Sequence, residues 1–596
     1  MMRNLLQRRA RKKPARPADL IAYDFETEPI REGITPRPLY LTAWSPTYEF
    51  AGIVEPSYRP RNLGAILGDA FLTEDKRGAC FVAWNGNRFD SYFIAAALAD
   101  NPAWKVRPYL TRTRELRGLR VQRASDPEGS RQGWQFLDGM AMLGIDCTLS
   151  QLLESFAPDF PKLPAPDWTG TGFDPDNIDH CVYALRDSEG LWHAMDRAQR
   201  IMLEHFNEPL RPTIGATAIR VFVSRIPEGV QVRKLDEAQD DIVRERLMRG
   251  GYVFCRGRYR GPVWKYDLNQ AYAGAMRDCP IPCGSVLWDR YGPEDTTGAY
   301  MVLLSAENPN NTVPWYVKVE DAQGRVRATY QTTVLRNVWL TSDEHRQLIA
   351  EGGWSIECHE HYAWARTFSM RELVDELESL RREAGPASPV GRMVKAVGNS
   401  AYGKTAEQSE GIEWLIAADR PPGWIEFYLD DDAEPVQGIY WRAESDPLEK
   451  DYHRPQVACW ITAWVRMQVR RAALLNPRAW LYADTDCVMF AADMTDDLDI
   501  DPTRYGAWKI EEAGTEYNII GRKVYASTDG RKRAASGLRT AALTAADFEA
   551  WLEGQAPKQH QVHLRNFLDV MTGAEMYRAV ERRGSTGESE DGFEQL

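Results

Sequence analysis

The sequence is poor in cysteine and histidine and has no long apolar run. Nine cysteines and nine histidines occur in 596 residues, and sparse cysteine is typical of a reducing compartment. Cys279 and Cys283 stand four apart with no second pair, which argues against a zinc ribbon. No apolar run is long enough to span a bilayer, and the N-terminal stretch MMRNLLQRRARKKPARP lacks the apolar block of a secretory signal. We therefore expect a soluble cytoplasmic protein without a membrane partner.

An excess of positive charge is also missing. The formal net charge is −13, which argues against a protein that coats nucleic acid through bulk charge but leaves room for a basic groove in an acidic body. The acidic runs YLDDDAEP and MTDDLDIDP and the end GESEDGFEQL are typical of solvated loops or tails. The basic tail, with Arg8, Arg9, Arg11, Lys12 and Lys13, either contacts a partner or has none.

The order of periodic segments predicts several domains. The length suffices for about four domains, and strands alternate with helices over the first ~200 residues, as in an α/β domain. Later segments are strand-rich at 285–360, helical at 369–385, 389–403 and 458–475, and without a clear period at 405–452. The C-terminal part mixes short strands with one expected helix, TAADFEAWLEG. We expect a multidomain chain of α/β and α+β class.

Two aspartates interrupt an apolar segment in AWLYADTDCVMF. Asp484 and Asp486 lie in a strand–turn–strand pattern, at or beside its tip. Residues two apart in a strand share a face, and burying two like charges is costly without a positive partner. Carboxylate oxygens suit Mg²⁺, so the pair predicts a site for a divalent cation.

A third acid and a polar helix stripe have similar settings. Asp267 ends a β-prone run before a helix, so it either joins Asp484 and Asp486 around metals or simply caps that helix. Arg392, Lys395, Asn399 and Tyr402 recur at helical spacing. This stripe either contacts a triphosphate and a base or is a solvated helix face.

The N-terminal region has its own acids. Asp24 and Glu26 lie two apart on an expected strand, Asp90 ends the loop NGNRFD, and Tyr183 and Asp187 lie four apart on an expected helix. They are either scattered surface groups or a second two-metal site, in which Tyr183 helps to position water. The segment ECHEH, with Cys358, His359 and His361, is better explained as a polar strand end than as a metal site.

Six of these segments resemble the motifs of family B DNA polymerases, in the family's order. Tyr482-x-Asp484-Thr485-Asp486, Asp267-Leu-Asn-Gln-Ala-Tyr272 and Lys395-x-x-x-Asn399-Ser400-x-Tyr402-Gly403 resemble the polymerase motifs. Asp24-x-Glu26, Asn85-x-x-x-Phe89-Asp90 and Tyr183-x-x-x-Asp187 resemble the proofreading exonuclease motifs. The segment GRKVYAS, with Lys523 and Tyr525, resembles the lysine-x-tyrosine segment of the protein-primed branch found in tailed phages and linear plasmids.

The resemblance implies an RNase H-like exonuclease domain followed by a right-hand polymerase of palm, fingers and thumb with two terminal-protein-region insertions. The implied order is basic tail 1–18, exonuclease 19–205, palm 206–290, first insertion 291–360, fingers 361–404, second insertion 405–452, palm 453–530, and thumb with acidic tail 531–596. In the family the second insertion forms a hairpin that encircles template and aids strand displacement.

The resemblance also implies a role for each site residue. Asp267 and Asp486 would hold two Mg²⁺ ions beside Asp484, and Asp24, Glu26, Asp90 and Asp187 would hold two more beside Tyr183, with Mn²⁺ as the alternative ion. The implied substrate contacts are Tyr272, which excludes a 2′-hydroxyl, Lys395 and Arg382 on the triphosphate, Asn399 and Tyr402 at the nascent pair, Lys523 and Tyr525 at the primer end, and Asn85, Phe89 and Lys162 in the exonuclease.

The implied partners are template and primer DNA, dNTPs and a terminal protein, for a monomer in the cytoplasm of a phage host. The chain departs from the family pattern at Met248-Arg249-Gly250-Gly251, where an aromatic residue usually leads, and at Gln270, Ala273, Cys487 and Gly139-Met140. Two alternatives are a family B polymerase that uses ordinary nucleic-acid primers and a degenerate DNA-binding scaffold. The intact acids in five of the six motifs argue against the scaffold.

Overall fold

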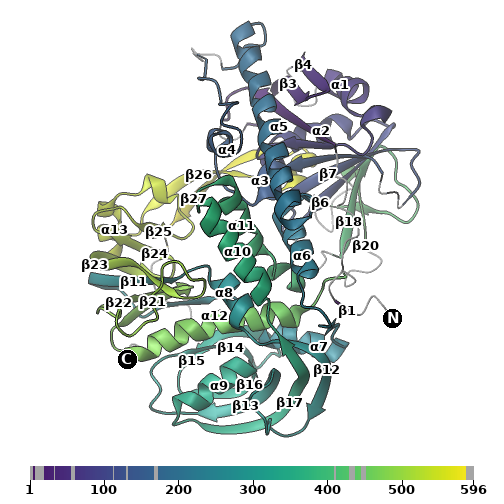
Figure 1. The fold of residues 1–596 in the computed structure, drawn as a ribbon. Helices are drawn as coiled ribbons and strands as arrows, with labels where there is room; N and C mark the ends of the chain where they lie inside the picture. The colour runs from purple at the N-terminus through teal and green to yellow at the C-terminus, as the bar shows by residue number, and fades with distance from the viewer. Residues whose placement is uncertain are drawn as a thin grey trace.

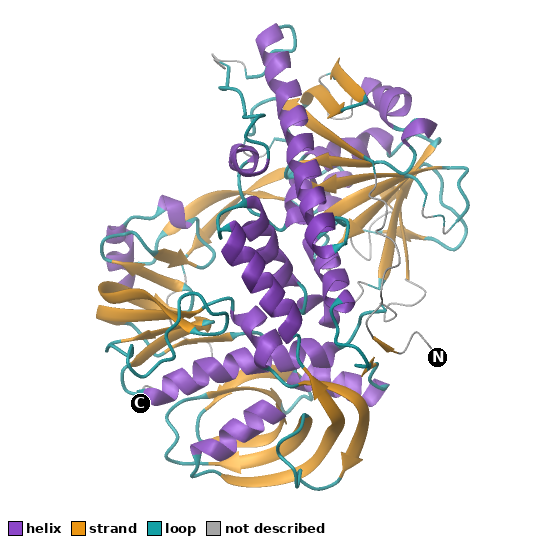
Figure 2. Ribbon diagram, in the orientation of Figure 1, coloured by secondary structure: helices purple, strands orange, loops and turns teal. Residues whose placement is uncertain are grey.

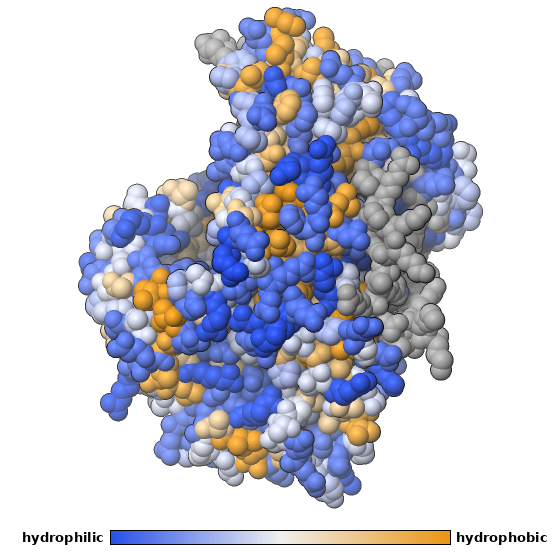
Figure 3. Space-filling model, in the orientation of Figure 1, coloured by the Kyte–Doolittle hydropathy of each residue, from blue (hydrophilic) through white to orange (hydrophobic). Residues whose placement is uncertain are grey.

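The computed structural model describes residues 5–6, 19–31, 34–55, 61–111, 113–128, 130, 132–166, 172–407, 411–428, 436–443 and 451–584. The expectations for the basic side chains of the tail and for the acidic end lie outside these residues. Within the described part of the chain, no helix is both long and apolar enough to cross a membrane. The face drawn in Figure 3 is largely hydrophilic, with small, separate hydrophobic areas.

A ten-stranded sheet is built mainly from the N-terminal third of the chain (Figure 1). Its strand order is β19-β20-β18-β6-β7-β8-β5-β2-β3-β4. The strands are β2 Leu20–Thr27, β3 Pro38–Ser45, β4 Tyr48–Ile53, β5 Cys80–Ala83, β6 Trp104–Leu110, β7 Leu116–Arg123, β8 Trp134–Asp138, β18 Ile412–Ala417, β19 Ile425–Phe427 and β20 Val436–Ala443. Among its helices are α2 Asp90–Leu98, α3 Gly139–Leu143 and α4 Leu149–Phe156.

The long helix α5, Ile178–Phe206, packs on β2 and β3 of this sheet. Thr42 on β3 and Ser188 on α5 share a buried hydrogen bond of 2.8 Å, and Trp192 donates to the carbonyl of Leu20. Burial of both helix and strand side chains at this contact fixes which face of α5 meets the sheet. Asp187 is therefore placed opposite the acids of β2.

A second sheet, of seven strands, lies on the other side of helices α10 and α11 (Figure 2). Its order is β10-β21-β22-β11-β23-β24-β25. The strands are β10 Tyr252–Cys255, β11 Tyr259–Leu268, β21 Trp480–Thr485, β22 Cys487–Phe490, β23 Trp508–Gly521, β24 Val524–Ser527 and β25 Arg533–Ala535. The adjoining helices are α8 Ala271–Asp278, α10 Arg371–Ala384, α11 Pro389–Ser400 and α12 Pro455–Leu475.

Residues 281–368 form a third unit against α12. Four strands in the order β12-β17-β13-β16, a β14–β15 pair and helix α9 make this unit. Their bounds are β12 Ile281–Asp289, β13 Tyr300–Glu307, β14 Trp315–Glu320, β15 Val326–Gln331, β16 Val334–Thr341, α9 Ser342–Glu351 and β17 Ser355–Phe368. The strand-rich expectation for 285–360 is confirmed.

The C-terminal part holds two helices, so the expectation of one was wrong. Besides α13, Ala545–Leu552, the short helix α14, Phe567–Met571, precedes the second strand of the pair β26 Lys558–Leu564 and β27 Tyr577–Arg583. Phe567 is fully buried and contacts Tyr92 of α2, with ring centroids 5.2 Å apart. Five residues are too few to show a helical period, and contact with α2 stabilises this turn.

The segment without a clear period also has a regular structure. β18 pairs with β6 through Ile416↔Val106 and Ala417↔Lys105, so the hairpin of β18 and β20 extends the N-terminal sheet. Its register depends on a partner about 300 positions earlier, which local periodicity cannot reveal. The boundaries between the exonuclease, palm, fingers, thumb and insertion regions remain predictions.

Candidate active sites

The first candidate site is the tight turn between β21 and β22. Asp484 pairs with Cys487 across the hairpin, which leaves Thr485 and Asp486 as its two loop residues, and Thr485 has a φ of +62°. The amide of Asp486 donates to the carbonyl of Asp484 over 2.7 Å. The prediction that the two acids lie at or beside the tip of a strand–turn–strand pattern is therefore confirmed. They do not share one face of a single strand, because Asp486 lies in the turn.

Asp267 lies directly beside this turn. It is the last residue but one of β11 and lies between its register partners Cys487 on β22 and Lys509 on β23. The amide of the next residue, Leu268, donates to the carbonyl of Asp486 over 2.8 Å. Helix α8 begins after Gln270, which is its N-cap residue. The helix-cap explanation of Asp267 is therefore wrong, and the strand pairing brings the three acids into one region.

Lysines contact two of these acids. Lys509 Nζ lies 2.8 Å from Asp267 Oδ2, and Lys523 Nζ lies 2.9 Å from Asp484 Oδ1. Lys523 is more than half exposed, so its ion pair contributes little to stability, whereas Asp267 and Lys509 are both less exposed. Part of the positive charge that the acids require thus comes from the chain itself.

The electrostatics of this site favour a cation. Burial, followed by repulsion from Asp267, raises the pKa of Asp486 to about 6. Burial also raises the pKa of Asp267, although Lys509 opposes that change. A raised carboxyl pKa means that the ionised form lacks compensation, which a divalent cation would supply. The donor set therefore fits hard-cation binding.

Tyr272 and Tyr402 form the aromatic edge of this site. Their rings stack with centroids 4.6 Å apart and an interplanar angle of 22°. Tyr402, a member of the predicted helical stripe, lies beyond the end of α11, so the prediction that it continues the stripe on the helix was wrong. The side chains of Lys395 and Asn399 are exposed on the helix, as the stripe predicted. The negative charge of Asp486 contributes to the raised pKa of both tyrosines, after burial, which is the largest cause in each case.

The other predicted nucleotide and primer contacts lie on helix α10 and on or beside strand β24 of the seven-stranded sheet. Arg382 lies exposed in the last turn of α10, where it donates to Ser379. Tyr525 on β24 contacts the ring of Tyr482 at 5.4 Å, and Tyr482 accepts a hydrogen bond from the amide of Lys523. Lys523 and Tyr525 therefore lie beside the Asp484 turn, whereas no contact links Arg382 to it.

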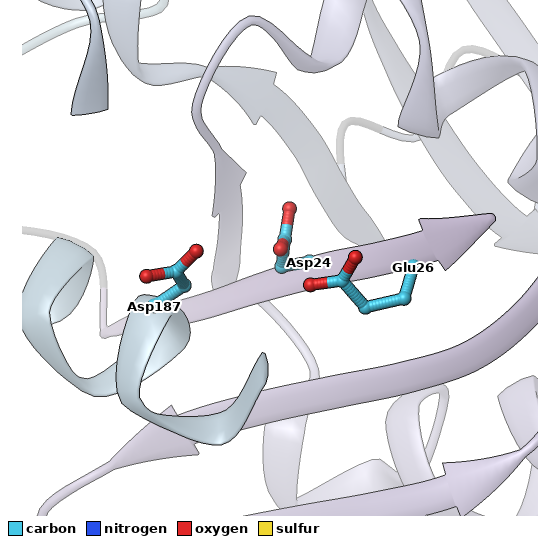
Figure 4. A group of neighbouring side chains, drawn as sticks. All are labelled: Asp24, Glu26 and Asp187. Carbon is cyan, nitrogen blue, oxygen red and sulfur yellow. The ribbon is translucent and has the colours of Figure 1, made fainter. Parts of the chain in front are cut away.

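The second candidate site joins β2 and α5 (Figure 4). Ligand oxygens of Asp24, Glu26 and Asp187 all lie within 4.8 Å of one another. Burial raises the pKa of all three acids, that of Glu26 to about 7, with repulsion from Asp187 as the next cause for Glu26. Three converging carboxylates of this kind fit a divalent cation.

Lys162 and Tyr183 lie at this cluster. Lys162 Nζ is 2.5 Å from Asp187 Oδ2 and 5.0 Å from the centre of the Tyr183 ring. The predicted fourth acid, Asp90, is buried at the start of α2, where it accepts the amide of Phe25 over 3.1 Å. It adds to the repulsion on Asp24 without belonging to the converging set, and burial raises its pKa to about 7.

Asn85 and Phe89 shape the loop that carries Asp90. Asn85 has a φ of +66°, and Phe89 is the residue before α2 and contacts Phe93 with ring centroids 5.2 Å apart. The ring contact anchors the start of α2, and the left-handed residue turns the chain after β5. These two residues therefore position Asp90, whatever else they contact.

Two polar residues at these sites were not predicted. Lys509 lies in the segment GAWKIEE but is identified only by its register against Asp267. Asp138 is buried at the end of β8 and accepts the amides of Asn87 and Met140 at 3.2 and 2.8 Å. An acid that ends the apolar strand WQFLD resembles Asp267 in setting, so Asp138 could have been found by the same signal.

His359 and His361 are engaged in ordinary hydrogen bonds. His359 contacts Ser305, and His361 contacts the carbonyl of Tyr291, from a strand of the third unit. Among the described residues, the acidic cluster of Asp24, Glu26 and Asp187 is the one group of three with converging metal ligands. These contacts agree with the interpretation of ECHEH as a polar strand segment.

Comparison with known proteins gives consistent matches. A family model described as "DNA polymerase type B, organellar and viral" matches residues 183–421. The chain is 24% identical over 534 residues to the DNA-directed DNA polymerase of Enterobacteria phage PRD1, covering 87% of this chain and 85% of that protein. It is 24% identical over 307 residues to the DNA polymerase of Streptococcus phage Cp-1, covering 49% and 51%.

The fold matches a solved phage polymerase over nearly its whole length. Phi29 DNA polymerase, in a ternary complex with primer-template DNA and incoming nucleotide, superimposes with a TM-score of 0.69 at 15% identity, covering 96% of this chain and 100% of that one. The predicted fold class, an exonuclease domain followed by a palm, fingers and thumb, is therefore confirmed. Part of the chain is therefore similar to type B DNA polymerases of the organellar and viral kind, and the whole chain has the fold of Phi29 DNA polymerase.

Proposed function

We propose that this chain is a family B DNA polymerase, which adds dNTPs to a primer 3′ hydroxyl in the Asp267–Asp486 site and removes mispaired 3′ ends in the Asp24–Glu26–Asp187 site. One observation carries the proposal: strand pairing sets Asp267 beside Asp486 in a chain that is similar to this family. Phosphoryl transfer depends chiefly on positioning and charge stabilisation. Half-buried acids that strand pairing sets side by side at the end of a rigid sheet supply such positioning.

In the polymerase site each side chain has a distinct task. Asp267 and Asp486 would hold the cations, with Asp484 beside them, and Lys523 and Tyr525 would orient the primer end. Lys395 and Arg382 would bind the triphosphate, and Asn399 and Tyr402 would border the nascent pair. When bound, paired Mg²⁺ ions supply charge neutralisation at the attacking and leaving oxygens. Tyr272, stacked on Tyr402, would occupy the space that a ribose 2′-hydroxyl needs.

In the exonuclease site the same logic applies with water as the attacking group. Asp24, Glu26 and Asp187 would hold the cations, and Asp90 would add negative charge behind them. Tyr183 would orient the water, and Lys162, paired with Asp187, would limit the repulsion among the acids. Asn85 and Phe89 would hold the loop that meets the frayed strand.

We further propose that the first primer is a hydroxyl of a terminal protein. The lysine-x-tyrosine segment, the strand-rich residues 291–360 and the hairpin at 412–443 support this branch of the family. The alternative is extension of ordinary nucleic-acid primers. Incorporation of the first labelled dNMP onto a purified terminal protein, without any oligonucleotide primer, distinguishes the two.

Separation of the two activities tests the main proposal. Asp486→Ala should abolish primer extension and leave degradation of a single-stranded oligonucleotide near the wild-type rate. Asp187→Ala is the matched control and should do the reverse. If Asp486→Ala removes both activities from a folded protein, the assignment of two independent sites is wrong.

A further inference from the structure

We propose that Glu344, which lies in the third unit, is a positioning residue for the polymerase site. It holds two buried arginines that fix the backbone beneath the Asp484–Asp486 turn. This inference rests on the proposed function, because it concerns the geometry of that same site.

Glu344 is the carboxylate at which three parts of the chain meet. Its Oε1 accepts from Arg466 Nη2 over 2.9 Å and also contacts Arg249 Nη2, and its Oε2 accepts the amide and hydroxyl of Thr341 at 3.0 and 3.1 Å. The side chains of Glu344 and Arg466 are 1% exposed, and that of Arg249 is 0% exposed. Helix α9, helix α12 and the segment before β10 therefore share one buried ionic centre.

Arg466 links Glu344 to the backbone of the segment before β10. Its Nη1 donates to the carbonyls of Arg249 and Gly250 at 3.0 and 3.3 Å. One guanidinium thus binds Glu344 with one edge and the segment Arg249–Gly250 with the other. Its planar fork can make these contacts together, which a lysine ammonium could not reproduce.

The fixed segment lies directly against the catalytic turn. A Cβ added at Gly251 would lie 2.8 Å from Cα, Oγ1 and Cγ2 of Thr485. Thr485 is the residue between Asp484 and Asp486, and it is also the register partner of Tyr252. A shift of Gly251 therefore moves the turn that carries the two acids.

The charge arrangement makes Glu344 difficult to replace. Although burial opposes ionisation, Arg249 and Arg466 lower the pKa of Glu344 to about 2, so it remains charged at neutral pH. Without that charge, two buried guanidinium groups would face each other unneutralised, which is strongly unfavourable. Their separation would release the carbonyl contacts that hold Gly251 in place.

The same two helices provide a matched control. Glu351, also on α9, pairs with Arg470 of α12 at 2.6 Å, and Arg470 has a side-chain exposure of 0%. Arg470 donates to the carbonyls of Val313 and Pro314 in the third unit, not to the segment before β10. The Pro314 carbonyl also accepts from the hydroxyl of Tyr252 on β10, but Glu351→Gln leaves the contact between Arg470 and that carbonyl available. Glu351→Gln therefore breaks a comparable buried pair that holds no part of the segment Arg249–Gly251.

The experiment compares full-length wild type, Glu344→Gln and Glu351→Gln in primer extension across a Mg²⁺ titration. Because a misplacement of about 1 Å can cost about 100-fold in rate, Glu344→Gln should lower kcat by about 10- to 100-fold and raise the Mg²⁺ requirement, with the KM for dNTP within about 3-fold. Glu351→Gln should extend like wild type. Amide exchange at 484–487 in metal-free protein should accelerate only in Glu344→Gln.

A second variant covers the case in which Glu344→Gln does not fold. Gly251→Ala leaves the ionic centre intact but presses directly on Thr485, and it should give the same loss of kcat and the same Mg²⁺ dependence. The inference is overturned if Glu344→Gln and Glu351→Gln behave alike, or if Gly251→Ala extends like wild type at every Mg²⁺ concentration. Failure of the wild type to extend a primer would instead refute the proposed function itself.

Discussion

At the scale of single residues, both candidate sites pair carboxylates with lysines, one pair in the site of β2 and α5 and two beside the Asp484–Asp486 turn. Asp187 has Lys162, Asp267 has Lys509 and Asp484 has Lys523. A neighbouring ammonium offsets part of the repulsion among clustered acids. Because Lys523 donates to both carboxylate oxygens of Asp484, its ammonium keeps only one further donor for the proposed contact with a primer.

Tyr272 provides a prediction at this scale. Tyr272→Val removes the ring that stacks on Tyr402 and opens space beside Asp486, so incorporation of ribonucleotides relative to deoxynucleotides should rise by at least about 10-fold, about 1.4 kcal/mol of lost discrimination. Single-nucleotide insertion kinetics with matched dNTP and rNTP measure this ratio. Tyr402→Phe, which keeps the stacked ring, is the control. Unchanged sugar selection in Tyr272→Val would remove the proposed steric role.

At the scale of secondary structure, local sequence patterns predicted the positions of several acids, but they could not predict which strands pair with each other. Acids at the ends of apolar strands, such as Asp267, and acids at helical spacing, such as Asp187, were found because periodicity is local. Lys509 was missed because its contact depends on strand register. The same limit hid β18, whose partner β6 lies far away in sequence.

The junction of β18–β20 with β6 depends on one tryptophan. Trp424 is buried, with Arg107 of β6 at 5.2 Å and Arg442 of β20 at 4.5 Å from its ring centre. Arg107 and Arg442 also share Glu128, at 2.8 and 3.1 Å. The ring thus contacts two cations, one from each partner strand, and contributes cation–π as well as apolar contacts.

Loss of this ring should loosen the hairpin. Trp424→Ala should cost about 3 kcal/mol locally and accelerate amide exchange in β18, whereas extension on an open template should stay near wild type. If the hairpin aids strand displacement, minicircle synthesis without helicase should fall several-fold. Trp414→Ala, on the same hairpin but only half-buried, is the control. If Trp424→Ala shows rapid amide exchange in β18 but normal minicircle synthesis, the hairpin does not aid strand displacement.

At the scale of the whole molecule, the buried acids of the candidate sites reduce the free energy of unfolding at neutral pH. Buried acids whose pKa is raised bind more protons in the folded chain than in the unfolded one, so the free energy of unfolding falls as pH rises through that range. Glu26, with a pKa of about 7 against an ordinary 4.5, is such a group. Glu28, two residues along, is the opposite case, because its hydrogen bond to Arg37 lowers its pKa.

Because the pKa of Glu26 is raised and that of Glu28 is lowered, their replacements should affect thermal unfolding in chelator differently. Glu26→Gln should unfold at about the wild-type temperature at pH 5 and about 1–3 °C higher at pH 8, because the penalty of the ionised carboxylate is complete only above pH 7. Glu28→Gln should not gain at pH 8, since it loses a contact that is present above pH 4.5 and disappears on acidification. Saturating Mg²⁺ should reduce the advantage of Glu26→Gln by stabilising the wild-type carboxylate. If the unfolding temperature of Glu26→Gln is lower than that of wild type at pH 8 in chelator, the ionised acids of β2 and α5 do not destabilise the folded chain, and the proposed cation site loses this support.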